Sequence, residues 1–271
     1  MICLIQVTQY VKPLDGWSRP HLMLCDDGNF YVIKLLSNPQ GVKVLVNEFI
    51  CSQLAKQLNL PIPEGKILFI SKRVINSHPT LKSVLQEGPH FGSRFIPSGI
   101  HQPTCLDLAR CTNIEQAADM IVFDYWLDNN DRHVWRPAEQ NLIVTGGSEP
   151  KIWMIDQANV FNGPAWSIES LIKKMNIFNA YWGTLYQRFV PFIDGPNPFR
   201  NSVSKFQSLT KGELFNVVFN IPAEWNVSEQ ELTILVNYME HRRKVMYYMI
   251  QSVHVHFPIW HVHYLKHGGI G

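Results

Sequence analysis

The chain has 271 residues, of which 46% are hydrophobic, 17% charged and 12% aromatic. This length and apolar content suffice for one large domain or for two lobes around a cleft, and they exclude an intrinsically disordered chain. The formal net charge of +2 gives no electrostatic signal for nucleic acid or for a membrane surface. No apolar run approaches the ~18 residues of a membrane span, and the first residues lack the basic region of a signal peptide.

The cysteine content indicates a reducing compartment. Five cysteines are an odd number, and no two of them form a C-x-x-C pair. We therefore expect reduced thiols packed in the interior, which fits a cytoplasmic protein. The sequence gives no indication of an oligomeric state.

The first hundred residues are predicted to form β-structure with one helix. Apolar alternation and turn residues predict strands at 2–11, 21–25, 30–36 and 66–70, a helix over about 44–58, and an irregular stretch at 72–113.

Two charged residues stand out in this region. Lys34 lies on an otherwise apolar strand face, and Glu48 lies in the inward stripe of the helix. An unpaired carboxylate in such a stripe is costly, so we predict an ion pair between them. A lysine that extends to solvent from an edge strand is the alternative.

The turn Pro13–Pro20 joins the first two strands. It contains only Gly16, so it is not the G-x-G-x-x-G loop of protein kinases, and the chain has no P-loop sequence. Ser18, Arg19 and the backbone N–H groups of this turn are candidates to bind phosphate. An ordinary hairpin loop is the alternative.

The stretch from 124 to 156 concentrates polar residues around two short strand-like runs. Asp131 closes a polar loop, Asn141 begins the run NLIV, and Asp156 follows the run KIWMI. The turn GGSEP predicts a hairpin, which brings Asn141 and Asp156 to the same end. Such oxygen donors suit Mg²⁺, and Asp131 is left to orient or deprotonate a hydroxyl.

The remainder of the chain is predicted to be helical, and it carries no pattern that indicates substrate recognition. Apolar spacing predicts helices at 114–127, 166–176, 179–188, 210–218 and 229–251. We expect the basic run 242–244 on the solvated face of the last helix. Histidines at 254, 256, 261 and 263 have no cysteine or acid beside them, and Pro258 interrupts them, so a metal site is not expected there.

In order and spacing, these segments resemble the HipA-like kinases, within the protein-kinase-like and phosphoinositide-kinase-like superfamily. The resemblance covers most of 12–160, through GWSRPHLML, DDGNFYVIKL, VNEFICSQLAKQLNLPIPE, HFGSRF, DNNDRH and NLIV…MIDQA. It implies an α+β, two-lobed protein-kinase-like fold. A small β-rich N-lobe with one helix would cover ATP over 1–95, and a larger, mainly helical C-lobe would occupy 96–271.

The resemblance also implies a reaction, in which ATP and Mg²⁺ are used to phosphorylate serine or threonine in a hydroxyl-bearing protein substrate. Lys34 matches the lysine that binds the ATP phosphates, and Glu48 matches its helical partner. Asp131 matches the catalytic aspartate, and Asn141 and Asp156 match the two metal ligands.

Some features depart from the family pattern. Asn141 lies ten positions after Asp131, which is more than the usual spacing, and Asp-Gln-Ala replaces Asp-Phe-Gly at Asp156. Arg132, beside the catalytic aspartate, would hold the loop or bind the transferring phosphate. The alternatives are a nucleotide-binding pseudokinase acting as a scaffold, or a lipid kinase, small-molecule kinase or AMP transferase on the same fold.

Overall fold

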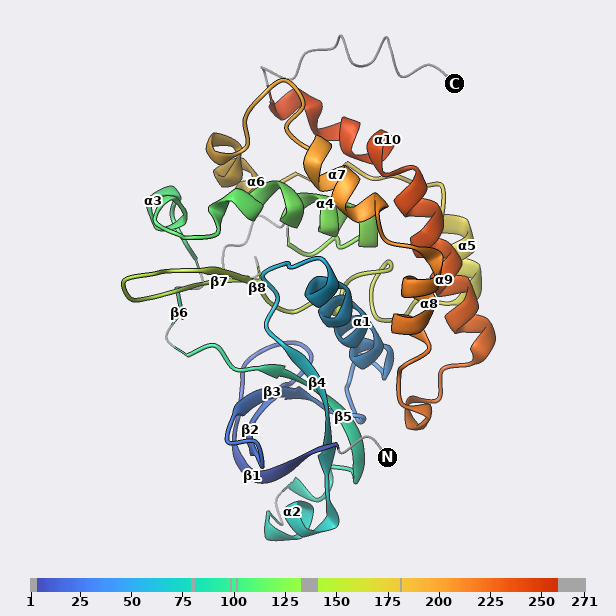
Figure 1. Ribbon diagram of the computed structural model, residues 1–271. Coiled ribbons are helices and arrows are strands. Elements are labelled where there is room, and N and C mark those ends of the chain that lie inside the picture. Colours follow the sequence, from blue (N-terminus) through green and yellow to red (C-terminus); the bar gives the residue numbers. More distant parts are fainter. Residues whose placement is uncertain are drawn as a thin grey trace.

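The computed structural model describes residues 4–78, 81–97, 99–100, 102–132, 141–180 and 182–257. Figure 1 shows a β-barrel at one end of the molecule and a mainly helical part at the other. Within the described part of the chain, no helix is long and apolar enough to cross a membrane. The tail histidines at 261 and 263 lie outside the described residues.

The barrel contains five strands: β1 (Ile5–Pro13), β2 (His21–Cys25), β3 (Phe30–Lys34), β4 (Gly65–Ile70) and β5 (Gly88–Arg94). Their order is β1-β2-β3-β5-β4, and the barrel closes through a parallel pairing of β1 with β4, while the other pairs are antiparallel. A separate sheet contains β6 (Gly99–Ile100), β7 (Leu142–Thr145) and β8 (Ile152–Met154). The predicted hairpin is present, because β7 and β8 pair antiparallel.

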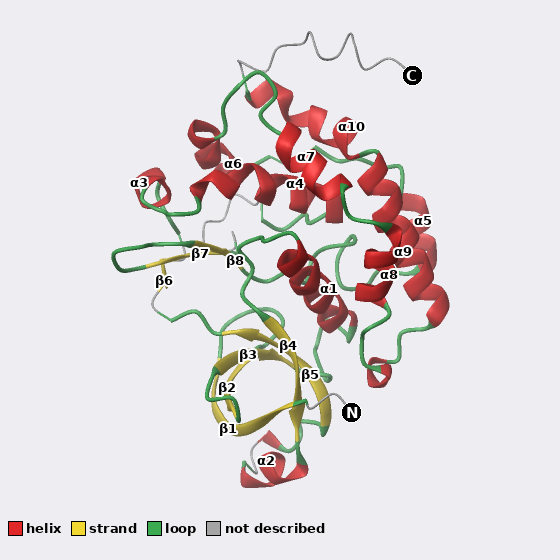
Figure 2. Ribbon diagram, in the orientation of Figure 1, coloured by secondary structure: helices red, strands yellow, loops and turns green. Residues whose placement is uncertain are grey.

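The helices gather mainly in the second part of the chain (Figure 2). They are α1 (Lys43–Gln57), α2 (Lys72–Ser77), α3 (Cys105–Ala109), α4 (Ala117–Leu127), α5 (Ile168–Lys174), α6 (Thr184–Phe189), α7 (Arg200–Gln207), α8 (Lys211–Val218), α9 (Glu229–Lys244) and α10 (Met246–Ile250). Short 3₁₀ helices cover Ile114–Gln116, Val190–Phe192, Ala223–Trp225 and Gln251–His256.

The predicted elements differ from these at several places. The stretch 72–113 is not irregular, because it holds the whole of β5 as well as α2, β6 and α3. The sequence of β5 has few apolar residues, so no local pattern predicts a strand there. It forms a strand because it pairs with β3 and β4 on its two sides. The helix predicted over 229–251 is two helices, since α9 ends at Lys244 and α10 begins at Met246.

The prediction that the run 242–244 faces solvent is wrong for Arg242. Its side chain is buried, and its guanidinium donates to the carbonyl oxygens of Trp126 at 2.8 Å and Tyr125 at 2.7 Å. These carbonyls lie in the last turn of α4, where the helix dipole favours a cation. Lys244 does lie at the surface, as predicted.

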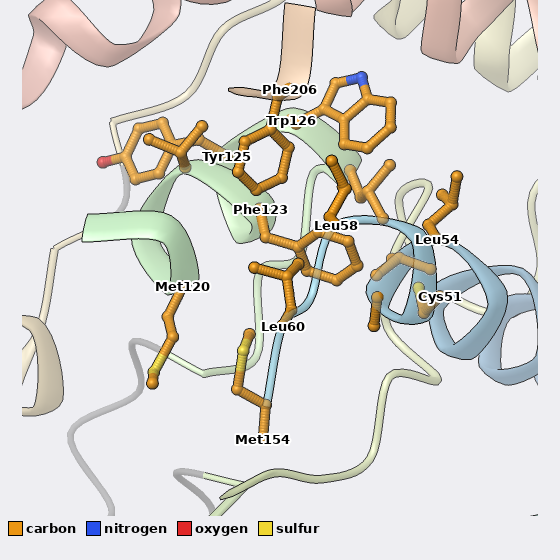
Figure 3. Packing of buried hydrophobic residues seen from close by; sticks show 14 of the residues in the cluster. Cys51, Leu54, Leu58, Leu60, Met120, Phe123, Tyr125, Trp126, Met154 and Phe206 are labelled. Carbon is orange, nitrogen blue, oxygen red and sulfur yellow. The ribbon is translucent and has the colours of Figure 1, made fainter. Parts of the chain in front are cut away.

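The main core lies between α1 and α4 (Figure 3). Eleven residues of α1 are buried, which is expected of a helix that is apolar on most of its surface. The rings of Phe123 and Trp126 in α4 contact each other edge to face at 6.3 Å, and Phe206 of α7 packs on Trp126 at 5.7 Å. Such aromatic pairs each add about 0.5–1.5 kcal/mol beyond area burial. This packing fixes α4, and α4 leads directly into the loop that carries Asp131.

Helix α1 also touches the barrel, so it spans both parts of the molecule. The Oγ atom of Ser52 accepts from the backbone N–H of Gly65 in β4 at 2.8 Å. A second link between the two parts is the indole of Trp225, which donates to the carbonyl of Pro89 in β5 at 2.9 Å. The barrel is therefore bound to the helical part through both Ser52 and Trp225.

Candidate active site

Three elements meet at the side chain of Lys34, the last residue of β3. Lys34 is buried, and its Nζ atom contacts Oε1 of Glu48 in α1 and, at 2.6 Å, Oδ1 of Asp156, which follows β8. The ion pair predicted between Lys34 and Glu48 is confirmed. We call Lys34, Glu48 and Asp156 the Lys34 cluster.

In the Lys34 cluster, two carboxyl groups share one ammonium. Burial disfavours the ammonium, but the carboxylates of Asp156 and Glu48 outweigh burial and raise the pKa of Lys34 above its ordinary value. Burial raises the pKa of Glu48, against the attraction of Lys34. For Asp156, burial acts upward and Lys34 prevails, so that its pKa lies below the ordinary value.

The segment after Asp156 is attached to α1 by buried hydrogen bonds. The backbone N–H of Gln157 donates to Oε1 of Glu48 at 2.9 Å. The amide of Asn47 donates to the carbonyls of Ala158 at 2.7 Å and Val160 at 3.2 Å. Side chains of α1 therefore hold the backbone on both sides of position 159.

Asp131 is held by neutral groups. Its Oδ2 atom accepts hydrogen bonds from the side-chain amides of Asn141 at 2.7 Å and Asn159 at 2.8 Å. Burial raises the pKa of Asp131, while the hydrogen bond from Asn159, the charge of Arg132 and the hydrogen bond from Asn141 oppose the rise. We call Asp131, Asn141 and Asn159 the Asp131 cluster.

Asn159 was not predicted as a site residue. Its only signal in the sequence is its place three residues after Asp156. No spacing rule connects an amide at that position to a carboxylate 28 residues earlier, so the contact depends on how the two loops fold together.

Arg132 is fully buried, and its guanidinium makes hydrogen bonds to neighbouring groups of the protein. Its Nε atom donates to Oδ2 of Asp124 in α4 at 2.8 Å, and Nη2 donates to Oε1 of Gln157 at 2.8 Å. Its Nη1 atom donates to the backbone carbonyl of Asn141. The hydroxyl of Tyr186 also binds Asp124, at 2.8 Å. This geometry favours the role of holding the loop over that of binding phosphate.

Ser18 and Arg19 lie in the loop between β1 and β2. Ser18 is buried, its carbonyl accepts from the amide of Asn38 at 3.0 Å, and no hydrogen bond to its Oγ atom is found from the described residues. Arg19 has a φ of 44°, and the neighbouring Trp17 is 84% exposed. Within the described ranges, no hydrogen bond or ion pair joins Ser18 or Arg19 to the Lys34 cluster. Their phosphate-binding role stays a prediction.

Asn141 and Asp156 flank the same end of the β7–β8 pair. Leu142 pairs with Met154, and the N–H of Ile155 donates to the carbonyl of Asn141 at 2.9 Å. Among the residues that the structure describes, no group of three or more histidine, cysteine or acidic side chains forms a metal cage. One carboxylate and one amide fit Mg²⁺, which is usually bound through one or two carboxylates and completed by phosphate and water.

The geometry is that of a kinase-like site: a strand lysine, a helical glutamate and a carboxylate after a hairpin, with a second carboxylate on a neighbouring loop. The family model described as HipA-like kinase matches residues 6–252. The chain therefore belongs to the HipA-like kinase family. A search of curated proteins finds no match.

Solved structures of kinases share the fold. A Helicobacter pylori proinflammatory kinase, CtkA, is 11% identical with a TM-score of 0.60, over 94% of this chain and 97% of that one. A Golgi casein kinase with Mn/ADP bound is 11% identical with a TM-score of 0.50, over 92% of this chain and 72% of that one. Another structure of Golgi casein kinase is 10% identical with a TM-score of 0.50, over 99% and 73% of the respective chains. Family and fold together support a phosphotransferase.

Proposed function

We propose that this protein is an ATP- and Mg²⁺-dependent serine/threonine protein kinase that transfers the γ-phosphate of ATP to a substrate hydroxyl. The observation that carries the proposal is the assembled Lys34 cluster, in which residues from β3, α1 and the end of β8 meet at one buried ammonium. In the proposed arrangement, residues 1–95 form an ATP-covering N-lobe and residues 96–271 form a C-lobe with the catalytic and metal-binding loops.

The Lys34 cluster supplies the phosphate-binding half of the proposed site. The ammonium of Lys34 would neutralise phosphate oxygens, with Glu48 fixing its position. Asp156 and Asn141 would hold Mg²⁺, which when bound neutralises charge on the phosphate oxygens. The lowered pKa of Asp156 keeps this carboxylate ionised, which supports the binding of a cation there.

Asp131 supplies the other half, as the acceptor of the hydroxyl proton. The side-chain amides of the described residues donate to its Oδ2 atom, and in the proposed reaction Oδ1 would face the substrate hydroxyl. As the hydroxyl oxygen bonds to the γ-phosphorus, its proton would pass to Asp131, and the bond from phosphorus to the leaving ADP oxygen would break. Positioned general bases contribute about 10²–10⁴-fold to rate.

We also propose a cytoplasmic location. Cys25, Cys51 and Cys111 are buried free thiols, and burial raises the pKa of each of them. Reduced, unreactive thiols of this kind are typical of a reducing compartment.

The proposed function is tested by incubating the purified protein with ATP and Mg²⁺, then measuring ADP release and intact mass, with Asp131→Asn as the matched variant. We expect ADP release from the wild type that is lost in the variant. A mass gain of one phosphate would show autophosphorylation, and a gain of AMP would establish the AMP-transferase alternative. Thermal stabilisation by ATP without any turnover would show nucleotide binding and would favour the pseudokinase alternative.

A further inference from the structure

The carboxylate of Asp131 receives two amide hydrogen bonds on the same oxygen. Asn141 donates from the start of β7 and Asn159 from the loop after β8, at 2.7 and 2.8 Å. Two donors from different segments fix both the position and the rotation of a carboxylate, because they converge on one atom from two directions. Asn141 is already proposed as a metal ligand, whereas Asn159 has no role so far.

The backbone of Asn159 is held in place by α1. The residues on either side of it, Ala158 and Val160, both give their carbonyls to the buried amide of Asn47. The other end of that amide, Oδ1 of Asn47, accepts from the indole of Trp166 at 2.8 Å. Asn47 thus binds the segment with its amide N–H groups and Trp166 with its Oδ1 atom, and it precedes Glu48 of the Lys34 cluster in α1.

We propose that Asn159 is a positioning residue for phosphoryl transfer: it orients Asp131 and connects the orientation of that carboxylate to α1. The inference rests on the proposed function. The connection runs from α1 through Asn47 to the segment 158–160, and from the side chain of Asn159 to Asp131. Displacement of α1 would therefore disturb the phosphate-binding lysine and the proton acceptor together.

A neutral donor suits this position. A lysine or arginine in place of Asn159 would orient Asp131 equally well, but its charge would stabilise the ionised carboxylate and reduce its tendency to accept a proton. The one arginine next to Asp131 in the chain, Arg132, is directed to Asp124 instead. An amide orients the carboxylate of Asp131 and lowers the basicity of that carboxylate less than a cation would.

The test compares Asn159→Ala and Asn159→Asp with the wild type in ATP turnover, measured as ADP release at varied ATP and Mg²⁺. Asn201→Ala, an exposed position in α7, is the matched control. We expect kcat to fall about 10- to 100-fold in Asn159→Ala, as for the loss of a hydrogen bond to a charged group. The KM for ATP and the Mg²⁺ concentration for half-maximal rate should stay within about twofold, because Asn159 contacts neither the Lys34 cluster nor Asn141 through a hydrogen bond in the described residues.

The aspartate variant separates positioning from a general structural role. Asn159→Asp keeps the size of the side chain and places a carboxylate against Asp131, so we expect a larger fall in kcat than in Asn159→Ala. Wild-type kcat in Asn159→Ala, equal losses in the two variants, or a loss expressed only in KM would overturn the inference while leaving the proposed function intact. A wild type without ATP turnover would instead refute the proposed function, and the positioning role with it.

Discussion

The two carboxylates of the candidate site, Asp156 and Asp131, are held by different chemistry. Asp156 contacts a buried ammonium that it shares with Glu48, whereas Asp131 is bound by two neutral amides. The charge of Lys34 holds the pKa of Asp156 below its ordinary value against burial, whereas burial holds the pKa of Asp131 above its ordinary value although the two amides oppose the rise. A carboxylate that binds cations is best kept ionised, and one that accepts a proton is best kept basic.

Because of this difference, we expect the two clusters to contribute differently to folding stability and to the reaction rate. In the Lys34 cluster, the side chains of Lys34 and Glu48 are buried, so that removal of Lys34 leaves unpaired charge in the interior. The Asp131 cluster has a single charge and neutral donors, so changes in it should affect rate more than folding.

The largest expected effect follows a change to the base itself. Asp131→Asn keeps the size of the side chain and removes its ability to accept a proton. We expect ATP turnover to fall about 10²–10⁴-fold. Thermal unfolding should show a midpoint close to that of the wild type, and ATP should still stabilise the protein. Full activity in this variant would remove Asp131 from the proposed site.

The next prediction concerns the ionic cluster. Lys34→Met leaves the buried carboxylate of Glu48 without its cation, so we expect a loss of about 3–5 kcal/mol in the free energy of unfolding. The double variant Lys34→Met, Glu48→Gln removes the stranded charge and should recover part of that loss. Urea unfolding measures both. If the single and double variants are equally unstable, charge pairing does not hold α1 to β3.

The strand that carries Lys34 also depends on a neutral histidine. His90 in β5 accepts the N–H of Leu36 on Nδ1 at 3.0 Å, and its Nε2 atom donates to the carbonyl of Gln86 at 2.9 Å. Burial lowers the pKa of His90 to about 4. The unfolded chain, with a histidine pKa of about 6.5, binds this proton first as the pH falls.

Stability from His90 should therefore be complete above about pH 6.5 and should decrease as the pH falls toward about 4. The shift limits the loss to about 3 kcal/mol. Urea unfolding at a series of pH values measures it, and His90→Gln supplies the reference because glutamine does not titrate. Identical pH dependence in the wild type and His90→Gln would contradict this assignment.

The ion pair between Lys34 and Glu48 could be predicted from sequence because each of these two residues shows a local conflict. A lysine on an apolar strand face and a glutamate in the inward stripe of a helix each require a partner. The hairpin that brings Asn141 and Asp156 together is likewise encoded by a local turn. By contrast, Asn159 and the strand β5 depend on contacts between distant segments, and neither carries a local pattern. The periodicity of apolar residues shows which face of a helix or strand points inward, but it does not show which loops contact each other in the fold.

The basic run 242–244 is another case in which the sequence pattern does not reveal a contact between distant segments. Arg242 binds the carbonyls of Tyr125 and Trp126 and lies 3.8 Å from Asp128, so it supports the end of α4 from which the Asp131 loop departs. Lys244 is 65% exposed and contacts only Glu240, at 3.0 Å, among the ion pairs of the described residues.

Arg242→Lys retains the charge but cannot reproduce the forked donors, so we expect a loss of about 1–3 kcal/mol in the free energy of unfolding. Lys244→Ala, two residues further along the same run, should change it by less than about 0.5 kcal/mol. Urea unfolding of the two variants under one condition measures the difference. Equal effects would mean that α4 does not depend on Arg242.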